Sequence, residues 1–223
     1  MTSPSPNPQS GIQPEASAGL IDAQPLRVVV LASGQGTLLQ SLVDNLDAQR
    51  AQIVAVGSDK HCPALDRAQA AGIETFCQPF DQAARENRLR WNQQLAAAIE
   101  KHQPDIVVSA GFMRILGAPV LEAFPDRIIN THPALLPSFP GAHAVADALA
   151  YGVTISGTTV HLVDAGVDTG PIIAQRAVPV ANDDTEATLH ERIKIAERQL
   201  LVDVIHIIAE RELIRDGRKV RFS

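Results

Sequence analysis

The chain has 223 residues, of which 45% are hydrophobic and 20% are charged, the balance of a soluble globular protein with a substantial core. Its formal net charge of −6 argues against nucleic acid as the main partner, because no excess of basic residues is available for phosphate contacts. No apolar run reaches the roughly 18 residues that span a membrane, and no secretory signal is recognisable. The two cysteines, Cys62 and Cys77, fit no zinc-binding pattern. We therefore expect a cytoplasmic protein that needs no metal.

Residues 1–25 are rich in Ser, Pro, Gly and Gln and have no hydrophobic period, which predicts a disordered leader. A single folded domain is expected over residues 26–215. Residues 26–32 and 51–58 are Val-rich apolar runs typical of strands buried on both faces. The segment between them has the leucine spacing of a helix, with apolar residues at Leu38, Leu39, Leu42, Val43 and Leu46.

The next segments continue the alternation of helix and strand. Residues 62–71 are predicted to be a helix stopped by Gly72, and residues 73–77 a short strand. A helix over residues 85–102 and a strand over 106–110 follow. Strand and helix alternate about every 25–30 residues, which predicts parallel βαβ crossovers. The fold class is therefore α/β, a doubly wound, mostly parallel, Rossmann-like sheet.

The C-terminal part has a different pattern. After a short strand over residues 127–131, two longer β-rich runs at 153–163 and 171–180 are joined by a turn and predict an antiparallel part. A final helix is expected from Glu186 to about Leu213, capped by residues 183–185. Because the third helical position is Thr188 and not Glu or Gln, no capping box is expected there.

The loop between the first strand and the first helix reads Ser-Gly-Gln-Gly-Thr at residues 33–37. Such a junction presents free backbone N–H groups and the positive end of a helix dipole, which favours a monophosphate. No Gly-Lys-Ser/Thr follows, so the loop is not a P-loop. A dinucleotide site is a weaker alternative, because Leu39 occupies the third glycine position although Asp59 could bind a ribose. A tight turn without a ligand is a further alternative.

Asn130-Thr131-His132-Pro133 ends the strand at 127–131, where ligands gather in open α/β sheets. Asn130 and His132 are two residues apart, so both face the same side of an extended segment. An amide and an imidazole there can both donate to an oxygen that gains charge. Asp168, in the later turn, could favour the charged form of His132, and His161 is a second candidate. Structural roles for these residues are the alternative on spacing alone.

Four stretches together resemble the phosphoribosylglycinamide formyltransferases, a family of folate-dependent formyltransferases. They are Val-Leu-Ala-Ser-Gly-Gln-Gly-Thr (30–37), Ser-Ala-Gly-Phe-Met-Arg-Ile-Leu (109–116), Asn-Thr-His-Pro-Ala-Leu-Leu-Pro-Ser-Phe-Pro-Gly (130–141) and the segment 157–171. The resemblance covers Leu26 to about Leu213. It implies transfer of a formyl group from 10-formyltetrahydrofolate to the amine of glycinamide ribonucleotide in purine synthesis. It is also compatible with a homodimer.

The resemblance implies roles for individual residues. The catalytic residues would be Asn130, His132 and Asp168. The ribonucleotide would be bound by Gly36, Thr37, Leu38, Lys194 and Glu197. The folate site would comprise Arg88, Met113, Arg114, Ile115, Leu116, Asn130, Asp164, Ala165, Gly166, Val167 and Asp168, with His143 and His161 nearby. The implied phosphate-binding half spans about 26–125, the folate-binding and catalytic half about 105–180, and the C-terminal helix about 185–213.

Two residues depart from the family pattern. Leu38 stands where the family commonly has Asn, and Thr169 replaces a common Gly in the turn of Asp168. Three alternatives to the ribonucleotide formyltransferase are considered: formyltetrahydrofolate deformylase, another formyltransferase of the same superfamily, and a nucleotide-binding domain without catalysis. The last leaves the segment 130–133 and the Asp168 turn without a role.

Overall fold

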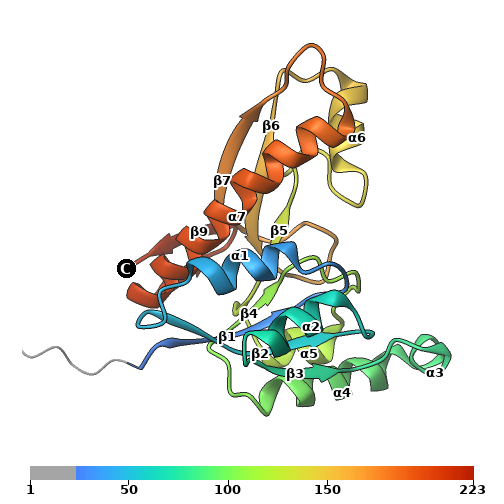
Figure 1. The fold of residues 1–223 in the computed structure, drawn as a ribbon, viewed down its shortest axis with the longest axis vertical. Helices are drawn as coiled ribbons and strands as arrows, with labels where there is room; N and C mark the ends of the chain where they lie inside the picture. Colours follow the sequence, from blue (N-terminus) through green and yellow to red (C-terminus); the bar gives the residue numbers. More distant parts are fainter. Residues whose placement is uncertain (1–23) are drawn as a thin grey trace, which may run out of the picture.

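The computed structural model describes residues 24–223, which form a nine-stranded sheet flanked by helices (Figure 1). Residues 1–23, which make up most of the predicted leader, lie outside the described part of the chain. The strands lie in the order β3-β2-β1-β4-β5-β6-β7-β9-β8. The first five run parallel: β1 (Leu26–Leu31), β2 (Ala51–Ser58), β3 (Glu74–Cys77), β4 (Ile106–Ser109) and β5 (Ile128–His132).

The strand order reverses at β1, which has β2 on one side and β4 on the other. In a doubly wound sheet, the connections that leave the carboxyl ends of these strands diverge and open a crevice between them. The doubly wound α/β class predicted from the alternation of strand and helix is confirmed. The crevice is where the loop at 33–37 and the segment at 109–116 meet, because they follow β1 and β4 directly.

Alternate residues of β1 pack into two separate cores, as the period of a buried strand requires. Val28 and Val30 face one layer of helices, whereas Val29 and Leu31 face the other. The first layer is α1 (Thr37–Asn45), α2 (Pro63–Ala70) and the C-terminal half of α7 (Glu186–Glu210); the second is α3 (Gln82–Glu86), α4 (Arg88–Glu100) and α5 (Ala118–Ala123). Within residues 24–223, no helix has the length and apolar character needed to cross a membrane.

The predicted antiparallel part is also present. Strands β6 (Ile155–Leu162) and β7 (Ile172–Pro179) pair antiparallel with each other, and β6 pairs antiparallel with β5. They extend away from the parallel strands, with α6 (Ala144–Tyr151) and the N-terminal half of α7 beside them (Figure 1). A small third core holds these elements together, with Val145 of α6 and Leu189 of α7 among its buried members.

The prediction of one helix over residues 85–102 is wrong, because the chain breaks at Asn87 into α3 and α4. The Asn87 side chain accepts a hydrogen bond from the Arg90 N–H at 3.0 Å and so starts α4 as an N-cap. An Asn side chain competes with the backbone for such donors, which explains why the break falls there. The short helices α5 and α6 were not predicted.

The capping box that was not expected at α7 is present. Thr185 Oγ1 accepts from the Thr188 N–H at 3.2 Å, and Thr188 Oγ1 accepts from the Thr185 N–H at 2.9 Å. A hydroxyl at the third helical position therefore serves in place of the Glu or Gln of the usual pattern.

The final helix ends at Glu210, three residues before the predicted end. A hairpin of β8 (Leu213–Asp216) and β9 (Lys219–Phe222) follows, turning at Gly217 with φ 59°. Strand β9 pairs with β7 at Ile172 and Lys219, so the hairpin extends the sheet. The predicted domain end at residue 215 therefore falls inside a strand.

Candidate active site

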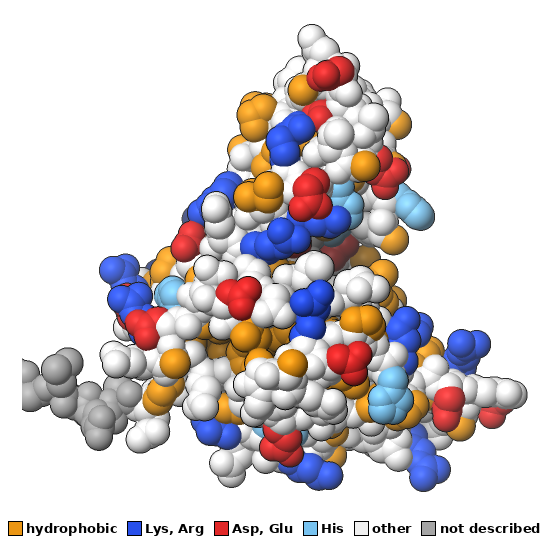
Figure 2. Space-filling model, viewed as in Figure 1, with side chains coloured by type: hydrophobic (Ala, Val, Ile, Leu, Met, Phe, Trp, Pro, Cys, Tyr) orange, Lys and Arg blue, Asp and Glu red, His pale blue; other side chains and the backbone are white. Residues whose placement is uncertain are grey.

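A cleft of about 610 Å³ lies at the carboxyl ends of β1, β4 and β5. Figure 2 shows Lys and Arg side chains gathered in the region where the upper part of the molecule meets the lower part. The cleft contains most of the residues singled out from the sequence. Those that line it are Gly36, Thr37, Leu38, Met113, Arg114, Ile115, Leu116, Asn130, His132, His161, Asp164, Gly166, Val167, Asp168, Lys194 and Glu197.

One end of the cleft is formed by the loop at 33–37. Gly36 precedes α1 with φ 70°, and no side chain caps the helix, so the first N–H groups of α1 lack helical acceptors. Arg67 braces the loop by donating from Nε to the Gln35 carbonyl at 2.8 Å. The Leu38 side chain is 8% exposed and packs in the core. Its backbone N–H is therefore the group through which Leu38 can bind an anion.

Replacing Gly36 by Ala is expected to lower the free energy of unfolding by about 1–2 kcal/mol, because a Cβ disfavours a positive φ. The new Cβ would also lie 2.7 Å from the Ala64 Cα, so the loop must shift and the first N–H groups of α1 must move with it. Urea denaturation and the KM for a phosphorylated substrate measure the two effects. Gly152→Ala is the matched control, since Gly152 also has a positive φ, a Cβ there meets nothing within 4 Å, and it does not line the cleft. Equal KM values in the two variants would contradict this account of the loop.

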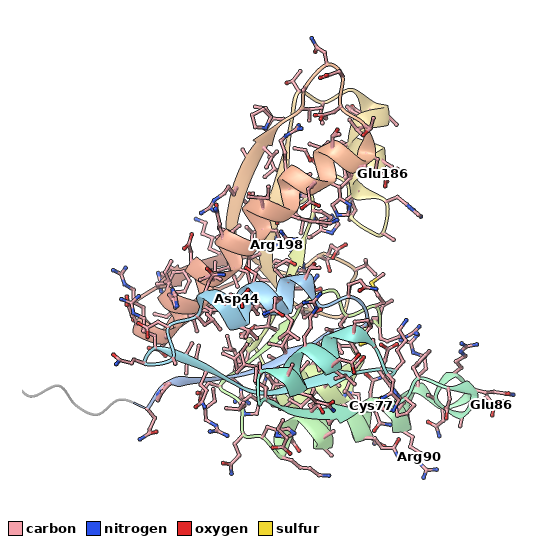
Figure 3. All side chains as sticks on the ribbon, viewed as in Figure 1. Asp44, Cys77, Glu86, Arg90, Glu186 and Arg198 are labelled. Carbon is pink, nitrogen blue, oxygen red and sulfur yellow. The ribbon has the colours of Figure 1, made fainter. Side chains whose placement is uncertain are left out.

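Helix α7 supplies another part of the cleft wall. His190, Lys194 and Arg198 recur every fourth residue, which places them on one side of the helix, and all three line the cleft. Figure 3 shows Arg198 where α7 passes α1. Burial, followed by the charge of Lys194, lowers the pKa of His190. Burial raises the pKa of the neighbouring Glu197 carboxyl. The sequence reasoning missed His190 and Arg198, although their spacing from Lys194 was a usable signal.

His132 and Asp168, 36 positions apart in the sequence, meet in the middle of the cleft. The His132 Nδ1 lies 3.3 Å from Asp168 Oδ2, and its Nε2 lies 2.7 Å from the Phe139 carbonyl oxygen. Both ring nitrogens therefore face oxygen acceptors. Asp168 has a φ of 54°, and its Oδ2 also accepts from the Gly141 N–H at 2.8 Å. The His132 ring thus lies between Asp168 and the Phe139 carbonyl, and the Asp168 carboxylate lies between His132 and the Gly141 N–H.

Asn130 lies beside His161, its direct partner across the β5–β6 pair. The His161 Nδ1 lies 2.8 Å from the Leu162 carbonyl, and its Nε2 lies 3.3 Å from Asn130 Nδ2. Burial lowers the pKa of His161, which favours the neutral ring. In that form Nδ1–H donates to the carbonyl and Nε2 accepts one N–H of the Asn130 amide. The second N–H of the amide remains for a ligand in the cleft.

His161 is expected to make the protein less stable in acid. Its pKa is lowered from 6.5 in the folded chain, so the unfolded chain takes up a proton first as the pH falls. The resulting contribution to stability is complete above the unfolded pKa and is lost as the pH falls through the folded pKa. The free energy of unfolding, measured by urea denaturation between about pH 8 and pH 5, should fall more steeply with decreasing pH for the wild type than for His161→Gln. If the free energy of unfolding fell equally with pH in both proteins, His161 would not be the source of the acid sensitivity.

The segment at 113–116 and the turn at 164–168 form the other end of the cleft, where Met113, Ile115 and Val167 expose apolar side chains. Arg114 Nε donates to the buried Asp59 Oδ2 at 2.7 Å. Asp59 therefore does not line the cleft, contrary to its suggested place in a ribose site.

Three predicted residues are not in the cleft lining: Arg88, Ala165 and His143. Arg88 contacts the segment at 113–116 without lining the cleft, since its Nη2 donates to the Ile115 carbonyl at 3.1 Å. His143 precedes α6 and directly follows Gly141 and Ala142, which do line the cleft. Among residues 24–223, no three His, Cys, Asp or Glu side chains are grouped so as to hold a metal ion.

Comparisons with known proteins give a consistent picture. Residues 26–205 match the family model described as formyl transferase. The chain is 53% identical over 195 residues to the phosphoribosylglycinamide formyltransferase of Mycobacterium tuberculosis, with 87% of this chain and 90% of the relative covered.

Two solved structures extend the comparison. The glycinamide ribonucleotide transformylase 1 of Symbiobacterium toebii is similar with a TM-score of 0.86 and 40% identity, covering 93% of this chain and 99% of that one. A formyltetrahydrofolate deformylase from Pseudomonas syringae has a TM-score of 0.81 and 27% identity, covering 90% and 67%. The fold is thus shared with a hydrolase, but the sequence is closer to the transferases.

Proposed function

Because the chain belongs to the formyl transferase family, it is a one-carbon transferase, and we propose that its acceptor is the amine of glycinamide ribonucleotide. The donor in this proposal is 10-formyltetrahydrofolate, and the reaction is a step of purine synthesis. One observation carries it: a single cleft joins the open N-terminus of α1 and the cations of α7 to Asn130, His132 and Asp168. A phosphorylated acceptor and a formyl donor can meet there.

The α1 end of the cleft suits the ribonucleotide. The free N–H groups of Thr37 and Leu38 are the donors that a phosphate monoester needs, and Lys194 and Arg198 supply positive charge from α7. Glu197 lies one residue from Arg198 and can accept from ribose hydroxyls. The Leu38 departure from the family pattern does not remove the backbone donor at that position.

The opposite end suits the folate. Met113, Ile115 and Val167 present apolar surface to a flat heteroaromatic ring, while backbone groups of the turn at 164–168 can hydrogen-bond its edge. Arg114 lines this end of the cleft, and Arg88 donates to the Ile115 carbonyl beside it. Their charges suit the carboxylates of a glutamate tail. These contacts would place the formyl carbon near Asn130 and His132.

In this proposal the second N–H of the Asn130 amide donates to the formyl oxygen, and the His132 Nε2–H turns from the Phe139 carbonyl to the same oxygen. Both act as the acceptor nitrogen bonds to the formyl carbon and that oxygen gains charge. Asp168 stabilises the imidazolium form of His132 and accepts a hydrogen bond from it. The bond between the formyl carbon and the folate nitrogen breaks, the amine loses a proton and the folate nitrogen gains one. Asp168 organises that proton transfer through a water molecule. Each preorganised donor contributes roughly 10²–10³ in rate.

Deformylation is the second candidate, because the same three residues could direct water onto the formyl carbon, and the deformylase from Pseudomonas syringae shares the fold. The cations of α7 and the open helix N-terminus favour the transferase, since a hydrolase that uses water needs no phosphate site. A domain that binds nucleotide without catalysis leaves the pair of His132 and Asp168 without a role.

A spectrophotometric assay tests the proposal. The purified protein is mixed with 10-formyltetrahydrofolate, and release of the deformylated folate is followed with and without glycinamide ribonucleotide. The proposal requires release that depends on the ribonucleotide. Release at the same rate without it would establish the deformylase, and absence of release while both ligands bind would establish the non-catalytic domain.

A further inference from the structure

The turn between β6 and β7 holds Asp168 in a backbone conformation that a residue with a side chain adopts at a cost. Asp168 has a φ of 54°, and a non-glycine residue in that region is disfavoured unless its surroundings hold it there. Its carboxylate must stay between the His132 ring and the Gly141 N–H, at 3.3 and 2.8 Å. The contacts that keep the turn in place are therefore relevant to the reaction.

Inside the turn, Asp164 and Thr169 form a closed hydrogen-bonded unit. Thr169 Oγ1 donates to Asp164 Oδ1 at 2.6 Å, and the Gly166 N–H donates to the same oxygen at 3.0 Å. The fit is close, because a Cβ at Gly166 would lie 2.0 Å from Thr169 Oγ1. A glycine at 169, common in the family, cannot form this unit because it has no hydroxyl. Thr169 thus gives this chain an additional hydrogen bond within the turn, next to Asp168.

The C-terminal hairpin holds the same residue from outside. Arg218, at the turn of the hairpin, donates from Nη1 to the Thr169 carbonyl at 3.1 Å. Pairing of Lys219 with Ile172 places the hairpin beside the start of β7. The hairpin follows residue 205, where the match to the family model ends. The Thr169 hydroxyl is therefore bonded within the turn, and the Thr169 carbonyl is bonded to the hairpin.

We propose that Thr169 and Arg218 are positioning residues that fix the turn at 164–169 so that the Asp168 carboxylate stays on His132. The inference rests on the proposed function, since it assigns the two residues to the same reaction. They do not touch the reacting atoms and act through Asp168. A preorganised carboxylate raises turnover because less rearrangement is needed during the reaction.

Two pairs of variants test the proposal. Thr169→Val removes the hydroxyl but keeps the branched shape, and Thr169→Ser restores the hydroxyl. Arg218→Gln removes the contact with the turn, and Arg221→Gln is the matched control, because Arg221 is an exposed arginine of the same hairpin. Thr169→Val and Arg218→Gln should each lower kcat roughly 3- to 10-fold, the effect of one hydrogen bond. Thr169→Ser and Arg221→Gln should stay within about twofold of wild type.

The Asp168→Asn background separates positioning from a general loss of structure. If Thr169 and Arg218 act through the carboxylate, their replacement should lower the residual kcat of Asp168→Asn by less than about twofold. The same 3- to 10-fold loss in that background would overturn the proposal, as would wild-type kcat for Thr169→Val and Arg218→Gln. Turnover of the wild type is measured first. Its absence would remove the proposed function, whereas normal turnover unaffected by either variant overturns only this inference.

Discussion

Replacing Asp168 by Asn is expected to lower kcat by roughly 10²- to 10⁴-fold while the protein remains folded. The amide keeps the size of the carboxylate, and its oxygen can still accept from the Gly141 N–H. It carries no negative charge, so the His132 ring loses the carboxylate that lies 3.3 Å from its Nδ1. Steady-state assays measure kcat, and thermal unfolding checks the fold. Turnover within about threefold of wild type would contradict the role of Asp168.

The matched control for this variant is Asp203→Asn, which makes the same chemical change at an exposed carboxylate. Asp203 binds Arg176 at 2.9 Å and does not line the cleft. Its kcat should equal that of the wild type. A large loss in both variants would mean that the assay responds to surface charge and not to the Asp168–His132 pair.

Replacing Asn130 by Ala is expected to lower kcat by roughly 10²- to 10³-fold with little change in the KM for the ribonucleotide. The loss follows because one amide N–H is held by His161 and the other is the donor available to the formyl oxygen. That donor acts most strongly when the oxygen carries charge, so the variant binds its substrates but turns over slowly.

Asn45→Ala is the control for Asn130→Ala, since the exposed Asn45 side chain donates to the Ser41 carbonyl and does not line the cleft. Wild-type turnover is expected for it. A rise in the ribonucleotide KM that accounts for the whole loss in Asn130→Ala would show that Asn130 holds the substrate and does not stabilise developing charge.

The sheet could be predicted because its signals are local. Val-rich runs such as residues 26–32 form strands buried on both faces, and the helix after them has a clear apolar period. The break at Asn87 escaped prediction because the side-chain cap stands within an otherwise helix-favouring segment. The C-terminal hairpin was not predicted because Leu213 and Ile214 also fit the apolar period of the preceding helix. Gly217 was the one residue there that indicated a turn.

The site was predictable where neighbours in the sequence are neighbours in space. Asn130 and His132 were placed on one side of a strand by their spacing alone. Asp168 could be suggested as a partner of His132 but not placed beside it, because the antiparallel pairing of β6 and β7 that brings it to β5 is not determined by spacing. The Asn130–His161 contact depends on the register of β5 and β6, which no local pattern determines.

The fate of the formyl carbon tests the central claim most directly. The protein is given 10-formyltetrahydrofolate labelled with carbon-13 in the formyl group, together with glycinamide ribonucleotide, and the products are separated and weighed by mass spectrometry. Direct transfer by Asn130, His132 and Asp168 predicts one labelled formyl group on the ribonucleotide for each folate consumed. Label recovered as formate, with the ribonucleotide unchanged, would contradict the account.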